Sequence, residues 1–277
     1  SRAARHALAW ASFVMSHQEQ EEEGGSASSS RAKQDGRGTK RALEARQPLY
    51  VIEHLEEGLE DWCMLEYKHI CRIVPTSRIL FLRFPSGQDP QVLVSEGSEP
   101  PKISGSTLEE ACGPGNKKEL PSWDRLCLMD MQADEALEPT DAAKFDAFIF
   151  GGILGNIIEN DDGSYGSDDR TCELRRLNFR NRRHLGPMQM TTDTAVLVSH
   201  MVLEEGKFLC DIPTLDSPEI AADEQTMQDG PQDAVCMEGF RYVVRRGNGS
   251  AWEPVLPDGM KELLLRSADD NILDSMA

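Results

Sequence analysis

Hydrophobic and polar positions alternate in a regular way from about residue 49 onward. Leu49 to Ile52 form a short apolar run of the kind that a buried strand needs. Between Leu59 and Val74 the apolar residues recur at helical spacing, and Pro75 marks the end of that helix. A second apolar run extends from Arg78 to Phe84. A strand, a helix and a strand in this order predict a parallel β-sheet.

The same alternation continues along the chain and predicts an α/β fold. Further strands are expected at residues 125–130, 145–150, 182–185, 207–212 and 240–244, and helices at 170–177, at 192–205 and from 258 onward. The acidic stretches at 157–169 and 216–238 are expected to be loops. Because no internal repeat is visible, we expect a single domain over residues 47–277.

Two segments lack this periodicity. Residues 1–46 combine an Ala/Arg-rich start, an acid-rich run and a serine cluster, and such a composition predicts a disordered tail. The start has the composition of an organelle transit peptide, but the acid-rich run that follows fits that interpretation poorly. Residues 86–122 are rich in Gly, Pro and Ser, and we expect them to form a mobile insertion with at most one small helix.

The distribution of charge narrows the class of partner. The chain of 277 residues has a net charge of -19. Residues 1–46 hold eight Lys/Arg and six Asp/Glu, so residues 47–277 hold 21 and 42, a net charge of -21. Such a body repels phosphate backbones and attracts cationic partners. A basic protein is therefore a more natural substrate than nucleic acid, although acidity can also serve solubility alone.

Cysteine usage and hydropathy point to a protein of the cytoplasm. The seven cysteines include no C-x-x-C pair, which favours reduced thiols over a disulfide framework or a zinc site. No apolar run approaches the roughly 20 residues that a membrane helix needs. We therefore expect no metal and no membrane partner.

Two glycine clusters each follow a predicted strand. Gly151, Gly152 and Gly155 come after the apolar run that ends at Phe150. A dinucleotide fingerprint would follow the first strand of the fold, whereas these glycines come about a hundred residues later, so a nicotinamide or flavin site is not expected. The chain also lacks the phosphate-binding G-x-x-x-x-G-K-[ST] motif. Alone, the cluster would more often be a tight turn than a ligand site.

The second cluster strengthens the case for a small ligand. Gly186 provides a bend, and Gln189 to Thr194 lead into a helix whose first free backbone N–H groups can hold an anionic part of a ligand. Thr191 or Thr192 can equally be an ordinary N-cap of that helix. Two strand ends that both run into glycine are suited to wrapping a ligand closely.

Seven segments, taken in order, resemble a known family. They are Tyr50–Gly58, Lys144–Gly155, Asp169–Thr171, Arg182–Gly186, Gln189–Ala195, Phe240–Val243 and Leu256–Met260. Together they are similar to the SPOUT-class methyltransferases of the yeast type that methylate an arginine of a small-subunit ribosomal protein. The resemblance extends from about Leu49 to the C-terminus, and it rests on the ordered set because no single segment is specific.

The resemblance implies a deep trefoil knot in the C-terminal half of the sheet and a site for S-adenosylmethionine. The residues that it implies for binding this methyl donor are Asp130, Gly151, Gly152, Leu154, Gly155, Arg170, Leu185, Gly186, Gln189, Met190, Thr191 and Thr192. A side chain in place of Gly152 or Gly186 is expected to occupy space that the ligand needs. The chain departs from the family pattern at Met131, where proline is expected, and in the greater length of residues 156–167.

Methyl transfer to arginine needs carboxylates that hold the guanidinium, because their bidentate contacts match its geometry. Glu53 at the end of the first strand and Asp193 beside the cofactor helix are the predicted catalytic residues. Glu56, Glu57 and the acids at 161–169 are weaker candidates, since acids also suit a solvated helix start. Asp193 also fits plain helix capping, and His54, a lone histidine after a strand, is more often structural.

One basic cluster interrupts the acidic body and keeps RNA as an alternative substrate. It comprises Arg175, Arg176, Arg180, Arg182, Arg183 and His184. A solvated helix face with charged strand edges explains the same residues, and we prefer that interpretation. The leading hypothesis is a protein-arginine methyltransferase that acts as a monomer on a basic ribosomal protein. The alternatives are an RNA methyltransferase and a non-catalytic module that binds the cofactor during ribosome assembly.

Overall fold

The computed structural model describes residues 47–113, 119–152, 157–159, 165–167, 171–221, 234–247 and 251–266. Between 157 and 167 only the backbone is described. All of these residues belong to one compact unit. The predicted tail at 1–46 and its transit-peptide interpretation lie outside the described residues.

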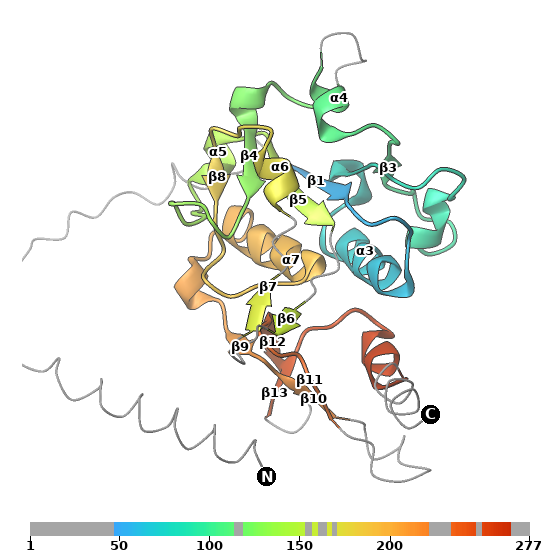
Figure 1. The fold of residues 1–277 in the computed structure, drawn as a ribbon, viewed down its shortest axis with the longest axis vertical. Helices are drawn as coiled ribbons and strands as arrows, with labels where there is room; N and C mark the ends of the chain where they lie inside the picture. Colours follow the sequence, from blue (N-terminus) through green and yellow to red (C-terminus); the bar gives the residue numbers. More distant parts are fainter. Residues whose placement is uncertain are drawn as a thin grey trace, which may run out of the picture. The chain divides into compact units, whose positions relative to one another are not determined.

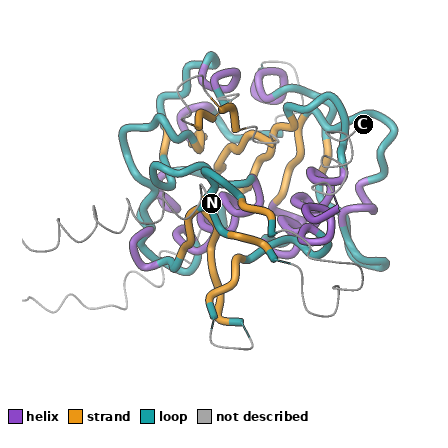
Figure 2. The backbone as a smooth tube through the Cα atoms, turned by 60° about the horizontal axis from the view of Figure 1, so that its bottom comes forward, coloured by secondary structure: helices purple, strands orange, loops and turns teal. Residues whose placement is uncertain are grey.

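A six-stranded parallel sheet forms the centre of the fold (Figure 1). Its strand order is β3-β2-β1-β5-β4-β8, and every neighbouring pair is parallel. The strands are β1 (Leu49–His54), β2 (Ile79–Leu82), β3 (Lys102–Ile103), β4 (Leu126–Met129), β5 (Ala147–Gly152) and β8 (Arg182–Arg183). Figure 2 shows strands side by side with helices and loops around them. The predicted α/β class with a parallel sheet is confirmed.

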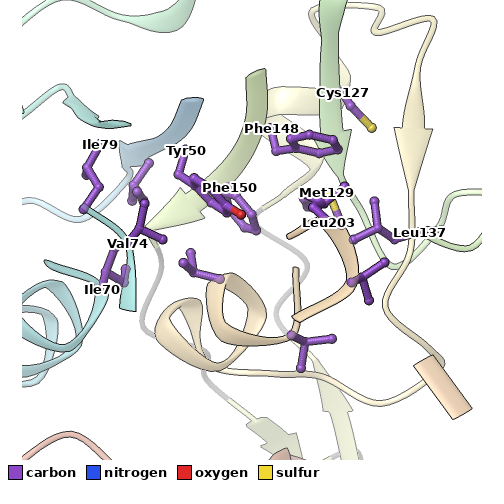
Figure 3. Close-up of a cluster of buried hydrophobic side chains, with 14 of the residues drawn as sticks. Tyr50, Ile70, Val74, Ile79, Cys127, Met129, Leu137, Phe148, Phe150 and Leu203 are labelled. Atoms are coloured by element: carbon purple, nitrogen blue, oxygen red, sulfur yellow. The ribbon is translucent and has the colours of Figure 1, made fainter. Parts of the chain in front are cut away.

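Side chains of each strand alternate between two hydrophobic clusters because the strand repeat is two residues. In β1, Ile52 belongs to one cluster and Val51 to the other. Helices α3 (Asp61–Ile73) and α7 (Thr192–Leu203) pack on the first cluster, part of which Figure 3 shows. Short helices α4 (Leu108–Cys112) and α6 (Cys172–Arg175) contribute to the second. Both faces of the sheet are therefore covered, as expected for parallel strands.

The segment predicted as an insertion at 86–122 contributes one strand to this sheet and two short helices that pack on it. It holds η2 (Pro90–Leu93), strand β3 and helix α4, and η3 (Trp123–Arg125) follows it. Thr107 and Glu110 form a capping box at the start of α4. Leu93 and Leu108 are buried in the two clusters. More of this segment is built into the core than its composition indicated.

Antiparallel strands make up the C-terminal part of the described chain. The strands β13 (Trp252–Pro254), β12 (Arg241–Arg246) and β9 (Thr214–Asp216) form one sheet, and β10 (Glu219–Ile220) pairs with β11 (Val235–Cys236). Residues 260–266 are helical, which confirms the predicted last helix. A third hydrophobic cluster, which includes Tyr242 and Met260, joins these elements.

Four local predictions differ from the structure. The acidic stretch at 216–238, expected to be a loop, contains the antiparallel strands β10 and β11. The strand expected at 207–212 is wrong: this stretch contains η4 (Leu209–Asp211), and Phe208 is 56% exposed because it has no sheet to pack against. The acidic loop expected at 157–169 contains an antiparallel pair, β6 (Ile157–Glu159) and β7 (Tyr165–Ser167). The helix expected at 170–177 is the single turn α6. Among the described helices, none is long and apolar enough to cross a membrane.

Candidate active site

A cavity of about 310 Å³ lies at the carboxyl ends of β4 and β5. Ligands of open α/β sheets commonly bind at this end of the strands. The segment that follows β8 and the first turn of α7 complete its walls. The lining residues are Met129, Asp130, Met131, Gln132, Phe150, Gly151, Thr171, Leu185, Gly186, Met188, Gln189, Met190, Thr192 and Ala195.

Short polar contacts fix the segment between β8 and α7 against this cavity. The Thr192 hydroxyl donates a hydrogen bond to the Gly151 carbonyl oxygen over 3.2 Å, which joins α7 to the end of β5. The backbone N–H of Arg241 donates to the Gln189 carbonyl oxygen over 2.7 Å. Gly186 has φ +121°, a backbone conformation that glycine adopts without strain. The walls are therefore set by the fold before any ligand binds.

Seven of the twelve residues predicted to bind the methyl donor line this cavity. They are Asp130, Gly151, Leu185, Gly186, Gln189, Met190 and Thr192. Gly152 and Thr191 are described but lie outside the lining set. Leu154, Gly155 and Arg170 fall outside the described residues. The individual donor contacts remain predictions, but most of the segments that were expected to meet do meet.

The structure requires a glycine at position 152, but for a different reason from the one predicted. A Cβ atom on Gly152 would overlap the hydroxyl of Tyr67 and lie 3.0 Å from the Ile52 Cγ2 atom. Tyr67 is fully buried, and its hydroxyl lies 2.8 Å from the His54 Nδ1 atom. The expectation that a Gly152 side chain fills ligand space is therefore wrong, because that side chain would meet the core.

His54 has a structural role in this arrangement. Its Nε2 atom lies 3.1 Å from the Gly58 carbonyl oxygen, which can only accept, so Nε2 carries the proton. The Nδ1 atom then accepts from the Tyr67 hydroxyl. Burial lowers the pKa of His54, which keeps the ring neutral. Both ring nitrogens are in use, as expected for a structural histidine.

Asp193 is buried in the first turn of α7 and does not line the cavity. Its Oδ2 atom is 2.7 Å from the His69 Nδ1 atom. Its Oδ1 atom has no hydrogen-bond partner within the described part of the chain. The predicted catalytic role of Asp193 stays a prediction, and its contact with His69 in α3 favours a supporting one.

Sequence analysis missed the acid that supports the start of α7. Glu66 in α3 is 2% exposed, accepts a 2.6 Å hydrogen bond from the Trp62 indole N–H, and lies beside Thr192, the first residue of α7. Thr191 is the N-cap of α7 but makes no side-chain cap bond, and its hydroxyl donates to the Thr194 hydroxyl oxygen over 2.8 Å. Burial raises the pKa of Glu66 well above its ordinary value, and the nearby charge of Asp193 raises it further.

Asp130 at the cavity wall is held by two arginines. Its carboxylate accepts hydrogen bonds from Arg175 over 2.8 Å and from Arg182 over 3.1 Å, and its side chain is fully buried. The Gln132 backbone N–H donates to the same carboxylate over 3.0 Å. These contacts shape the loop after β4, because both oxygen atoms of Asp130 are occupied.

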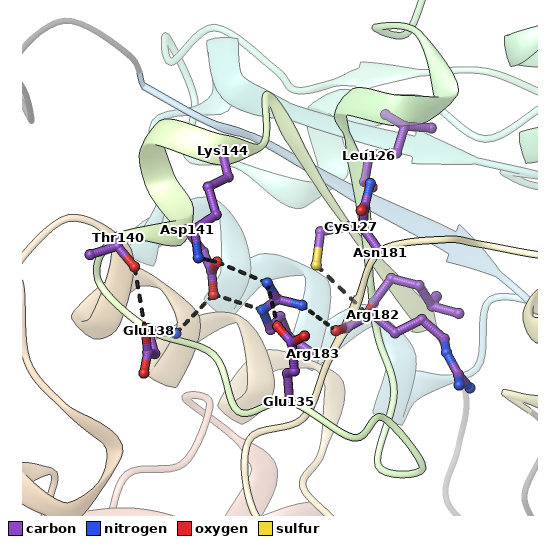
Figure 4. A network of polar contacts seen from close by, with 11 residues as sticks. Leu126, Cys127, Glu135, Glu138, Thr140, Asp141, Lys144, Asn181, Arg182 and Arg183 are labelled. Carbon is purple, nitrogen blue, oxygen red and sulfur yellow. Dashed lines mark hydrogen bonds and ion pairs between the residues drawn. The ribbon is translucent and has the colours of Figure 1, made fainter.

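Arg183 forms a second ion pair with a buried acid, shown in Figure 4. Its guanidinium donates two hydrogen bonds to Asp141, over 2.9 Å and 3.2 Å. Burial alone would raise the pKa of Asp141, but hydrogen bonds from Arg183 and Lys144 outweigh it and hold that pKa below its ordinary value. This pair joins the end of β8 to α5 (Asp141–Lys144). Three arginines of the predicted basic cluster therefore neutralise buried acids.

Glu53 is buried at the end of β1 and lies outside the cavity lining. Its Oε1 atom accepts a 3.2 Å hydrogen bond from the Leu108 backbone N–H. Its Oε2 atom has no hydrogen-bond partner in the described ranges. Burial raises the pKa of Glu53, although the Leu108 N–H and the charge of Arg83 oppose this shift. Its predicted catalytic role is not tested by these contacts alone.

The residues that the structure describes contain no candidate metal centre. No group of three or more His, Cys, Asp or Glu side chains among them is arranged to hold a metal ion. The expectation that the protein uses no metal stays a prediction.

Comparison with known proteins identifies the family. The family described as "Protein arginine N-methyltransferase SFM1-like" matches residues 49–271. Protein arginine N-methyltransferase SFM1 of Saccharomyces cerevisiae is 32% identical over 231 residues, which are 81% of this chain and 98% of that protein. The crystal structure of the yeast enzyme with S-adenosylmethionine has a TM-score of 0.62 at 30% identity and covers 82% of this chain and 96% of its own. Its complex with S-adenosylhomocysteine has a TM-score of 0.60 at 31% identity, with 80% and 96% covered.

These matches confirm the family that the seven sequence segments indicated, and with it the enzyme class and the methyl donor that the family uses. The matched region spans the whole central sheet and the antiparallel strands after it. The chain belongs to the SFM1-like family of protein arginine N-methyltransferases.

Proposed function

We propose that this protein transfers a methyl group from S-adenosylmethionine to an arginine side chain of a basic ribosomal protein. The observation that carries the proposal is the cavity at the carboxyl ends of β4 and β5. Its walls come from the same segments that resemble the family, and the yeast relative was solved with S-adenosylmethionine.

The residues present fit such a donor. Ligand sites are mostly apolar concave spaces of about 300 Å³ or more with a few polar groups. Leu185, Met190 and Ala195 supply apolar walls, while Gly151 and Gly186 leave the backbone open to close approach. When bound, the donor supplies a methyl group on a positively charged sulfur. The residues of the chain hold it in place and exclude water from it.

The net charge of residues 47–277 and the ion pairs of three arginines favour protein over RNA as the substrate. Residues 47–277 carry a net charge of -21, which attracts a basic protein. Arg175, Arg182 and Arg183 form ion pairs with Asp130 and Asp141. An RNA site would present these arginines to phosphates, whereas here their charge is largely cancelled.

We also propose that the backbone between β4 and α7 forms a trefoil knot. Strand β8 lies at the edge of the sheet beside β4, and the chain then returns so that α7 packs against β5. Gly151 in β5 and the residues Leu185 to Met190 after β8 contribute to the walls of one cavity along this path. An electron-density trace of residues 120–205 that contains no threaded loop would refute the knot.

Labelling identifies the substrate. The full chain is incubated with methyl-labelled S-adenosylmethionine and either ribosomal proteins or RNA from cells that lack this enzyme. The expected result is methylarginine in a small-subunit ribosomal protein and no label in RNA. Label in nucleosides alone would contradict the proposal. Donor binding with no transfer to either pool would support a non-catalytic assembly module instead.

A further inference from the structure

Glu53 is a buried acid whose hydrogen-bonding capacity is only half used. The residue is 3% exposed, and its Oε2 atom has no partner among the residues that the structure describes. A buried carboxylate oxygen without a partner is costly, so such a group calls for an explanation. One explanation is that a ligand completes the site.

Glu53 stands next to the methyl-donor cavity. In the parallel pair of β1 and β5 it is the register partner of Gly151, which lines that cavity. Neighbouring strands lie about 4.8 Å apart, so the two backbones are adjacent. Glu53 is therefore one strand away from a residue that lines the donor cavity.

Glu173 provides a second carboxylate on the same side of the sheet. It follows Thr171, another cavity-lining residue, by two positions, and its neighbour Leu174 packs in the cluster that Glu53 faces. Glu173 is close enough to Glu53 to raise its pKa. Each acid is thus next to a residue of the cavity lining: Glu53 is the register partner of Gly151, and Glu173 is two positions after Thr171.

A cation of the chain itself, Arg83, is close to both acids. The Arg83 Nη1 atom is 3.7 Å from the Glu173 Oε2 atom, and the charge of Arg83 also acts on Glu53. Arg83 has φ +50°, a left-handed conformation that costs energy in a residue other than glycine. Such strain collects at functional sites, and here it places a guanidinium beside two carboxylates.

We propose that Glu53 and Glu173 hold the guanidinium of the substrate arginine beside the methyl donor, that Glu53 takes its proton, and that Arg83 occupies this place in the free enzyme. The proposal rests on the protein-arginine methyltransferase function proposed above. A bidentate contact with Glu53 would give Oε2 the partner that it lacks.

The transfer balances with the groups named. A guanidinium nitrogen attacks the methyl carbon of the donor, and a nitrogen–carbon bond forms as the carbon–sulfur bond breaks. The bonding electron pair goes to sulfur, which becomes a neutral thioether. The proton of the attacking nitrogen passes to the Glu53 carboxylate, which an elevated pKa makes a stronger base.

Glu53→Gln separates this role from a structural one, since glutamine keeps the shape and the acceptor for the Leu108 N–H. We expect the rate of methyl transfer to ribosomal protein to fall at least about 100-fold, the usual contribution of a general base. The affinity for S-adenosylmethionine, measured by calorimetry, should stay within about two-fold of wild type. Glu109→Gln, an equal change at an exposed acid of α4, is the matched control and should retain full activity.

Two further variants test the other groups. Glu173→Gln should raise KM for the protein substrate and change kcat less, because it removes a contact to the guanidinium but no base. Arg83→Asn removes the resident cation, and asparagine tolerates its left-handed backbone, so KM should fall. Methylguanidinium, titrated into the chain loaded with S-adenosylhomocysteine, should bind wild type more tightly than Glu53→Gln.

The outcomes distinguish the guanidinium site from the proposed function. A Glu53→Gln enzyme as active as wild type would overturn the guanidinium site and leave the proposed function intact. A wild type that binds the donor but methylates no arginine would overturn the proposed function itself. Loss of activity together with loss of donor binding in Glu53→Gln would reassign Glu53 to the donor site and overturn the inference.

Discussion

Two buried acids at strand ends on either side of β5 have different hydrogen-bond partners. At the end of β4, Asp130 has both oxygen atoms bonded to Arg175 and Arg182. At the end of β1, Glu53 has one oxygen bonded to a backbone N–H and one without a partner in the described structure. Asp130 lines the cavity and Glu53 is the register partner of Gly151 in its lining, and both acids are 3% exposed, so burial alone does not explain the difference.

The difference separates an acid that builds the site from one that is available to a ligand. A buried charge with its partners in place organises the loop around it, and it has no capacity left for a substrate. A buried carboxylate with a raised pKa and an unused oxygen is suited to bind and deprotonate a cation. The comparison therefore gives Asp130 a structural role in the loop after β4 and gives Glu53 a role in binding and deprotonating the substrate.

The strongest test of this comparison measures stability. Asp130→Asn leaves Arg175 and Arg182 without their charge partner and should lower the free energy of unfolding by roughly 3 kcal/mol. Glu53→Gln keeps the Leu108 hydrogen bond and removes a buried charge whose raised pKa marks it as destabilising, so it should not lower that free energy. Urea unfolding of both variants provides the values. Equal losses in the two variants would show that both acids are structural.

A second test compares the two glycines at the cavity. Gly152→Ala would push against the buried Tyr67 hydroxyl and should lower the free energy of unfolding by about 2 kcal/mol, as overpacking does. Gly186→Ala would strain a backbone at φ +121° beside the Arg241 guanidinium, so it should also weaken donor binding. Thermal unfolding and calorimetric titration separate the two effects. Normal stability of Gly152→Ala would refute the contact with Tyr67.

Changes of pH give the smallest expected effect. The pKa of Asp141 is lowered in the folded state, so its stabilisation is present above its unfolded pKa and is lost as pH falls through its folded pKa. The pKa of Glu53 is raised, so its stabilisation is present below its ordinary 4.5 and is lost as pH rises through the folded value. Arg83, Glu173 and the Leu108 N–H are the groups that act on Glu53.

Urea unfolding at a series of pH values measures how Glu53 and Asp141 each change the free energy of unfolding with pH. Glu53→Gln should abolish the part of the stability loss above pH 4.5 that comes from this acid, because a glutamine side chain does not titrate. Arg183→Met should reduce the part of the acid-induced loss that comes from Asp141, because Lys144 and the Glu138 backbone N–H still bind this carboxylate. The comparison would be contradicted if Glu53→Gln changed the stability loss at low pH and Arg183→Met changed the loss above pH 4.5.

Local periodicity was sufficient to predict the first strand, α3 and the parallel sheet, because these elements depend on residues close in sequence. The contacts that support the site could not be predicted in this way. His69 and Asp193 are 124 residues apart, and Arg183 and Asp141 are 42 apart. Nothing local in the sequence distinguishes Glu66 from an exposed acid of α3, yet it is buried beside the first residue of α7. The strand expected at 207–212 failed because an apolar run alone does not ensure a neighbouring strand.

The position of the methyl-donor site is the central claim, and filling the cavity tests it most directly. Ala195 lines the cavity from α7, so Ala195→Phe places a large side chain in the proposed site. Ala143→Phe makes the same change at an exposed position of α5 and serves as the control. Calorimetric titration with S-adenosylmethionine should show that Ala195→Phe loses binding, while Ala143→Phe and wild type bind equally. Unchanged affinity in a folded Ala195→Phe protein would contradict the account.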